Sequence, residues 1–153
     1  MTHAVQPLHV LVVAPRPVGC DLAATLSRCE ALYDALEAQG DRVAIEWLRP
    51  ATPEALLKRL AAERAAAPLV TYLDSPMGLE DGVSALHMEG EEQAVRHLPW
   101  PALREALAQR DTGPTLLILG AGLAAEGRAA LAADESGVTL VALPQGLEAD
   151  AAR

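Results

Sequence analysis

The chain lacks phenylalanine altogether, and aromatic residues of all kinds make up only 3% of its 153 residues. Hydrophobic residues nevertheless reach 51%, a fraction that excludes an intrinsically disordered chain. A chain of this length is long enough to bury the core of one domain. We therefore expect a single domain over residues 1–153, with a core built from aliphatic side chains and few large rings.

Cysteine is nearly as scarce. The two thiols, Cys20 and Cys29, are too few for a disulfide scaffold or for a structural zinc site. They fall on or beside one predicted helix, about 13 Å apart along its axis, which is too far for a disulfide. We expect both thiols to be reduced and buried.

Basic residues are outnumbered by acidic ones, 12 against 21, and the formal net charge is −9. This balance disfavours nucleic acids and anionic membrane surfaces as partners, because both require a clustered basic surface. Residues 1–7 lack the features of a signal peptide, and no run is long and apolar enough to span a bilayer. We expect a soluble, cytoplasmic protein whose charged partners, if it has any, are basic.

Strand-like and helix-like stretches alternate along the chain. The β-branched run Leu8–Ala14 predicts a strand buried on both faces. Residues 83–88 and 94–98 predict a short hairpin, which follows a turn-rich loop at 74–81. The alternation predicts an α/β fold, a three-layer sandwich with a mostly parallel sheet and a small β-hairpin insertion. Further strands are predicted at 42–48, 69–73, 115–119 and 138–143, and helices at 21–39, 53–67, 99–110 and 126–133.

The first predicted helix carries apolar residues at three- and four-residue steps. This spacing places them in one stripe along the helix, which Leu32 widens. The members of the stripe are Leu22, Leu26, Cys29, Tyr33 and Leu36.

In open α/β sheets, ligands and catalytic groups gather at the carboxyl ends of the strands. Arg16 follows the first predicted strand, and an arginine there is suited to pair with a peptide carboxylate, although local pairing at the surface is the alternative. The candidate crevice at these strand ends consists of Arg16, Asp74, Ser75, Gly120 and Gly122.

No motif for a cofactor or a metal is present. The glycines of the segment 120–127 follow a strand and precede a helix, but the third is misplaced for a dinucleotide-binding loop. This segment therefore predicts a tight turn. No phosphate-binding loop occurs, and no histidine pair has metal-ligand spacing, so we expect no cofactor and no metal. His9, His87 and His97 are expected to be packed or solvated.

Two residues are candidate nucleophiles. Cys20 lies near the start of a helix, where a thiolate is favoured, but no base for it is evident in the sequence. Ser75 lacks the strand-to-helix setting of a nucleophile elbow. Structural roles are expected for both, and a hydrolase that uses either one stays open as a third possibility.

The order of segments resembles the CHAT domain, a branch of the caspase-like cysteine peptidases that is common in bacteria. The likeness covers nearly the whole chain, and its pieces are weak one by one. They are Val10–Pro17, Arg28–Gly40, Val43–Leu56, Leu98–Ala108 leading into Thr115–Gly122, and Gly137–Arg153.

The resemblance implies that the peptidase chemistry is lost. CHAT domains carry a catalytic histidine after the third strand and a catalytic cysteine after the fourth, and here Pro76 and Gly122 occupy those places. Neither residue can supply the imidazole or the thiolate that the chemistry needs. The resemblance also implies a shortened domain, or a fragment of a longer protein.

The sequence thus favours a non-catalytic caspase-like domain that acts as an adaptor, a scaffold or a regulatory partner through contact with another protein. An unfinished sheet edge near the fifth strand is one surface on which a partner strand could pair. The alternative is a flavodoxin-like domain that binds or hydrolyses a small ligand in the crevice around Arg16, Asp74 and Gly120.

Overall fold

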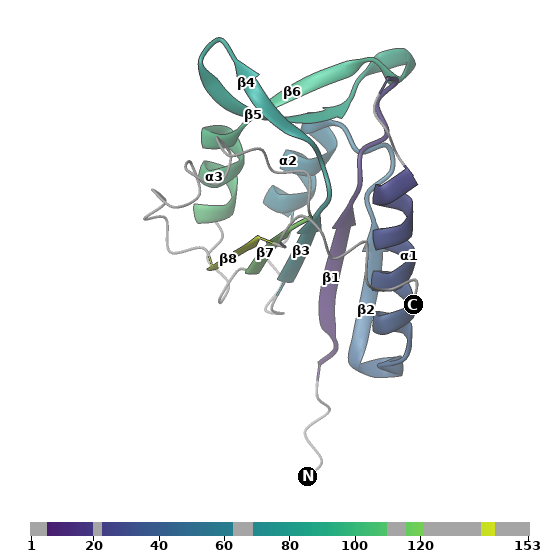
Figure 1. Cartoon of the computed structure of the whole chain (residues 1–153). Helices are drawn as coiled ribbons and strands as arrows, with labels where there is room; N and C mark the ends of the chain where they lie inside the picture. The colour runs from purple at the N-terminus through teal and green to yellow at the C-terminus, as the bar shows by residue number, and fades with distance from the viewer. Residues whose placement is uncertain (1–5, 20–22, 63–68, 110–115, 121–138, 143–153) are drawn as a thin grey trace.

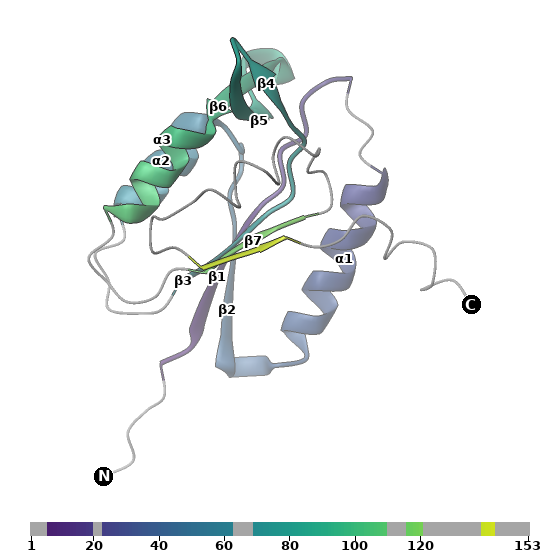
Figure 2. The ribbon, with the colours of Figure 1, turned by 60° about the vertical axis from the view of Figure 1, so that its left-hand side comes forward.

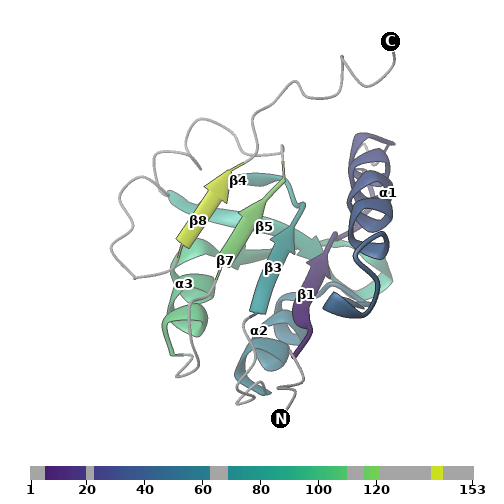
Figure 3. The same cartoon turned by 90° about the horizontal axis from the view of Figure 1, so that it is seen from below.

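In a computed structural model of the chain, five parallel strands form the central sheet (Figure 1). These strands are β1 (Leu8–Val13), β2 (Val43–Trp47), β3 (Leu69–Leu73), β7 (Leu116–Leu119) and β8 (Thr139–Ala142). They lie in the order β2-β1-β3-β7-β8, and every neighbouring pair is parallel. Figure 3 shows β1, β3, β7 and β8 side by side and pointing the same way. The structure describes residues 6–19, 23–62, 69–109, 116–120 and 139–142.

Helices cover both faces of this sheet. Helix α1 (Ala23–Glu37) lies on one face, and α2 (Pro53–Ala62) and α3 (Trp100–Ala108) lie together on the other (Figure 2). The predicted three-layer α/β sandwich with a mostly parallel sheet is therefore confirmed. Among the described residues, the helices are too short or too polar to cross a membrane.

A small antiparallel sheet lies beyond the carboxyl ends of the central strands (Figure 1). Its strands are β4 (Met77–Glu80), β5 (Val83–Glu89) and β6 (Val95–Pro99), in that order. The predicted hairpin corresponds to β5 and β6 and is confirmed. The expectation of a loop over residues 74–81 is wrong for β4, because Asp81 and Gly82 adopt positive φ and form the two-residue turn that pairs β4 with β5.

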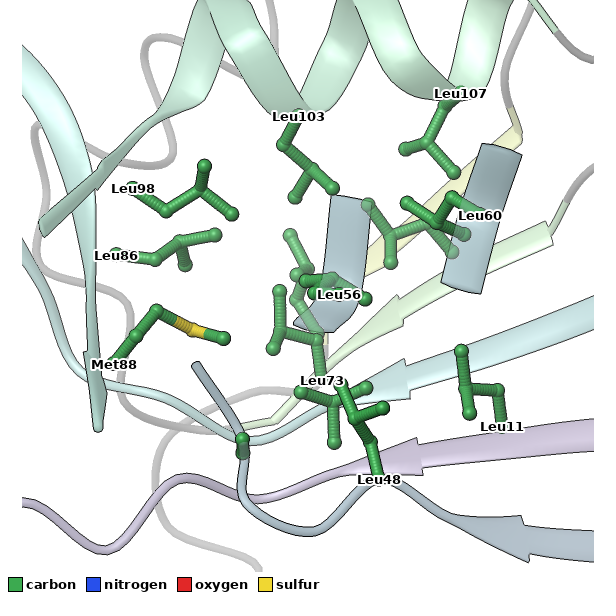
Figure 4. Close-up of a cluster of buried hydrophobic side chains, with 14 of the residues drawn as sticks. Leu11, Leu48, Leu56, Leu60, Leu73, Leu86, Met88, Leu98, Leu103 and Leu107 are labelled. Atoms are coloured by element: carbon green, nitrogen blue, oxygen red, sulfur yellow. The ribbon is translucent and has the colours of Figure 1, made fainter. Parts of the chain in front are cut away.

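Two apolar layers fill the space on either side of the central sheet. The larger lies between the sheet, α2, α3 and the small antiparallel sheet, and it is built almost entirely from leucine and methionine (Figure 4). The smaller lies against α1 and contains Val10, Val12, Cys29 and Tyr72. Alternate side chains of β1 from Val10 to Val13 enter opposite layers, which explains why this part of its sequence is apolar without interruption.

The buried side of α1 differs from the predicted stripe. Cys29 is 5% exposed, as expected, and Leu32 and Leu36 pack against the smaller apolar layer. Leu26 and Tyr33, however, are 38% and 39% exposed. The helix turns about 100° per residue, so a stripe centred on Cys29, Leu32 and Leu36 leaves Leu26 and Tyr33 at its margin. Leu22 lies outside the described residues.

Truncation of the core should be far more costly than the same change at the surface. Leu56 is fully buried between α2 and the sheet, and Leu56→Ala should lower the free energy of unfolding by about 2–5 kcal/mol. Leu79 is 59% exposed on β4, and Leu79→Ala should change the free energy of unfolding by no more than about 0.5 kcal/mol. Urea denaturation of the two variants measures both values, and equal losses would contradict this arrangement of the core.

Candidate functional site

The strand ends bring several of the predicted crevice residues together. The amide of Asp74 donates to the carbonyl of Val13 at 2.9 Å, and the amide of Gly120 donates to the carbonyl of Leu73 at 2.8 Å. These bonds extend the parallel ladders by one residue beyond β1, β3 and β7. Asp74 and Gly120 therefore lie side by side at the rim of the sheet.

The carboxylate of Asp74 is buried, with 2% of its surface exposed, and is fully engaged by its neighbours. Arg28 of α1 donates to it twice, from Nε at 2.7 Å and from Nη2 at 2.9 Å. The hydroxyl of Tyr72 donates to Oδ2 at 3.1 Å. Two-pronged pairing of this kind compensates the loss of water around both charges. Asp74 therefore anchors α1 to the sheet.

The Asp74 carboxylate occupies the space that a side chain at position 120 would need, so a glycine is required there. A Cβ at position 120 would lie 2.6 Å from Cγ and 2.7 Å from Oδ1 of Asp74, well inside contact distance. The glycine is thus explained by the close approach of a side chain of its own fold. Gly122 lies outside the described residues.

Ser75 also has a structural role, because its hydroxyl is bonded to the backbone of its own fold. It is 3% exposed, and its hydroxyl lies 2.6 Å from the carbonyl oxygen of His87 and 3.1 Å from that of Pro76. The amide of His87 in turn donates to the carbonyl of Pro76 at 2.9 Å. These bonds join the end of β3 to β5, and the hydroxyl of Ser75 makes no hydrogen bond to an imidazole within the described part of the chain.

Arg16 is exposed in the segment that follows β1, and Glu89 of β5 holds its backbone. The Arg16 amide donates to Oε1 of Glu89 at 2.7 Å, and the Ala51 amide donates to Oε2 at 2.8 Å. One carboxylate thus ties the loops that follow β1 and β2. The sequence identified Arg16 but gave no indication of Glu89, because the two residues are 73 positions apart.

The side chain of Arg16 lines a hollow of about 380 Å³ between α1 and the carboxyl end of β2. Leu26 and Tyr33, the two apolar residues at the exposed margin of α1, form part of its wall. The lining residues are Arg16, Leu26, Cys29, Glu30, Tyr33, Asp34 and Trp47. We call this feature the α1–β2 hollow. The predicted crevice placed a site between Arg16, Asp74 and Gly120, whereas the hollow contains only Arg16 of these three.

The ring of Trp47 in this wall is already in contact with the guanidinium of Arg49. The Cζ atom of Arg49 lies 5.6 Å from the centre of the Trp47 ring, within the range of a cation–π contact. Arg49 also donates to the carbonyl of Ala14 at 2.7 Å. Burial, followed by the charge of Arg16, lowers the pKa of Arg49 from its ordinary value.

Cys29 also lines the hollow, but its thiol is not activated. Burial, and after it the charge of Asp74, raises the pKa of Cys29, while the charges of Arg49, Arg28 and Arg16 act in the opposite direction. A raised pKa keeps the sulfur protonated, and the protonated form is a poor nucleophile. Cys20, the other candidate thiol, lies outside the described residues.

The histidines of the small sheet face each other across β5 and β6. The rings of His87 and His97 lie 5.0 Å apart, edge to face, and Nδ1 of His97 lies 3.3 Å from Oε2 of Glu80. Burial, and after it the charge of His97, lowers the pKa of His87, against a smaller opposite effect of Glu80. No cluster of three or more potential metal ligands occurs among the described residues.

No protein-family model matches the chain, and no curated protein is significantly similar to it in sequence. The resemblance to the CHAT domain therefore stays a prediction. In the structure, Pro76 follows β3 and offers only its backbone carbonyl to its neighbours, at the place that the resemblance assigns to a catalytic base.

A methyl group at position 120 should disturb the anchor formed by Asp74. Gly120→Ala should lower the free energy of unfolding by about 1–3 kcal/mol, because the new Cβ collides with the Asp74 carboxylate. In an Asp74→Ala background the same change should cost clearly less. Thermal or urea denaturation of the four proteins measures this coupling. Equal costs in the two backgrounds would show that the glycine serves another purpose.

The lowered pKa of His87 predicts how stability varies with pH. As the pH falls below about 6.5, the unfolded chain binds a proton at His87 before the folded protein does. This residue therefore contributes a loss of stability on acidification, with full stability retained above that pH. The drop in unfolding free energy between about pH 7.5 and pH 5.5 should be smaller in His87→Gln than in the unsubstituted protein. Parallel losses in the two proteins would contradict the assignment.

Proposed function

We propose that the chain is a non-catalytic domain that works by contact with another protein. This proposal rests on the observation that polar groups at the strand ends are bonded within the fold. Asp74 and Ser75, which stand where α/β enzymes of this architecture place reactive groups, are buried and bonded to Arg28 and to the backbone of β5. The implied replacement of a peptidase dyad by Pro76 and Gly122 supports the same conclusion.

The exposed margin of α1 and the α1–β2 hollow provide the contact surface. Leu26 and Tyr33 expose more than a third of their surface, and they lie beside a hollow that also contains Trp47. Aromatic residues in a partly enclosed setting are the side chains that most often dominate protein interfaces. In the described sheet, β2 is also an edge strand, the kind of position at which a partner strand can pair with the backbone.

A small-molecule site is the second candidate function. The strand order β2-β1-β3-β7-β8 is that of flavodoxin-like sheets, which bind ligands beside the ends of their first and third strands. The α1–β2 hollow has a volume within the range of ligand pockets, about 300–1,000 Å³. Against this candidate, the charged group at the end of β3, Asp74, is already paired with Arg28.

Substitutions at the margin of α1 should abolish partner capture without unfolding the protein. Tyr33→Lys places a charge in the proposed contact surface, and the tagged variant should lose at least about tenfold of any specific partner recovered from the native host. Leu79→Lys adds the same charge to an exposed apolar position on β4 and should leave the recovery unchanged. Quantitative mass spectrometry of the captured proteins measures both effects.

If Tyr33→Lys still captures the partner and Leu79→Lys does not, the contact surface lies on the small sheet, and the proposal is contradicted. The second candidate is tested on the same proteins by thermal shift with nucleotides and small organic acids. A ligand that raises the melting temperature of the unsubstituted protein but not of Tyr33→Lys would favour small-molecule binding over protein contact.

A further inference from the structure

The wall of the α1–β2 hollow combines acidic and aromatic side chains. Glu30 and Asp34 are four residues apart on α1, so they lie on the same side of the helix one turn apart. Tyr33 lies between them in sequence and is exposed to the same space. Arg16 is the only cation among the residues that line the hollow.

Glu30 and Asp34 take no part in the ion pairs that the described residues form. Arg28, the one basic residue of α1, is committed to the buried carboxylate of Asp74 on the other side of the helix. The remaining pairs join arginine or histidine to Glu46, Glu54 and Glu80. The acidic charge along the hollow is therefore available to a group from outside the described fold.

The aromatic side chains suit a cation as well. Arg49 of the chain itself lies over Trp47, which shows that a guanidinium fits against the ring at this place. Tyr33 presents a second ring, and rings near carboxylates favour arginine and lysine over neutral side chains. With about 380 Å³, the hollow is near the lower end of ligand-pocket volumes, a size suited to one extended side chain.

We infer that the hollow receives an arginine or lysine side chain from a basic segment of the partner protein, with Glu30 and Asp34 as the charge complement and Tyr33 as the stacking surface. This inference rests on the proposed function and specifies its partner. The net charge of −9 favours the approach of such a segment over long range. Arg16, at the loop side of the hollow, opposes the incoming cation and restricts how many basic residues can enter.

Because the hollow is lined by both a cation, Arg16, and the acidic Glu30 and Asp34, neutralising substitutions should change the affinity for a basic peptide in opposite directions. The probe is a short peptide, blocked at both ends and fluorescently labelled, that contains two arginines; its counterpart contains citrulline, which is neutral and has nearly the same shape. Binding is measured by fluorescence anisotropy at about 0.1 M salt and again at about 1 M, where exposed charges are screened.

The arginine peptide should bind at least about fivefold more tightly than the citrulline peptide at low salt, and this preference should fall at high salt. Asp34→Asn should weaken binding about fivefold, whereas Arg16→Gln should strengthen it about twofold. Glu105→Gln is the matched control: it removes one negative charge from α3, on the opposite face of the sheet, and should have no effect beyond a small change in long-range attraction (Figure 2).

Equal binding of the two peptides, or equal effects of Asp34→Asn and Glu105→Gln, would overturn the inference. Circular dichroism and melting temperature confirm that each variant is folded before binding is measured. In one outcome the arginine peptide does not bind, Tyr33→Lys no longer captures a host partner, and Asp34→Asn captures it normally. In that case this inference fails and the proposed function stands. If capture is insensitive to Tyr33→Lys, the proposed function itself fails.

Discussion

A single buried carboxylate, that of Asp74, holds together the parts of the molecule that meet at the ends of the central strands. Its backbone extends β3 along β1, and its side chain binds Arg28 of α1 while Gly120 leaves room for it after β7. Loss of one partner from such a pair would leave an uncompensated charge in the interior, at a cost of about 3–5 kcal/mol. The position of α1, and with it the shape of the α1–β2 hollow, depends on this pair.

This constraint also determines which groups at the strand ends are already bonded within the fold. An open α/β sheet normally offers the groups at its strand ends to a ligand. Here Asp74 and Ser75 are occupied within the fold, and the small antiparallel sheet lies over the same end of the molecule. The polar and aromatic side chains that line the α1–β2 hollow lie instead mostly along α1 and at the end of β2. A contact function on that side needs no change in the core.

The fold class was predictable because β1 and β3 are nearly continuous apolar runs, and strand-like and helix-like stretches alternate between them. The first strand of the small sheet, β4, was missed, although the Asp81-Gly82 dipeptide is a strong hairpin signal. The site was less predictable. Arg28 and Asp74 are 46 residues apart, and nothing local in the sequence indicates that they pair. The exposure of Leu26 and Tyr33 depends on the rotation of α1 against the sheet, which the apolar spacing alone does not determine.

Asp74 is bound by Arg28 inside the fold, and both oxygens of its carboxylate accept hydrogen bonds there. The most direct measurement is the rate at which the Nε hydrogen of Arg28 exchanges with water, followed by NMR in the unmodified protein. We predict exchange far slower than that of the exposed Arg42, because the hydrogen is bonded to a buried carboxylate. Exchange as fast as that of Arg42 would contradict this pairing and leave Asp74 open to a ligand or substrate.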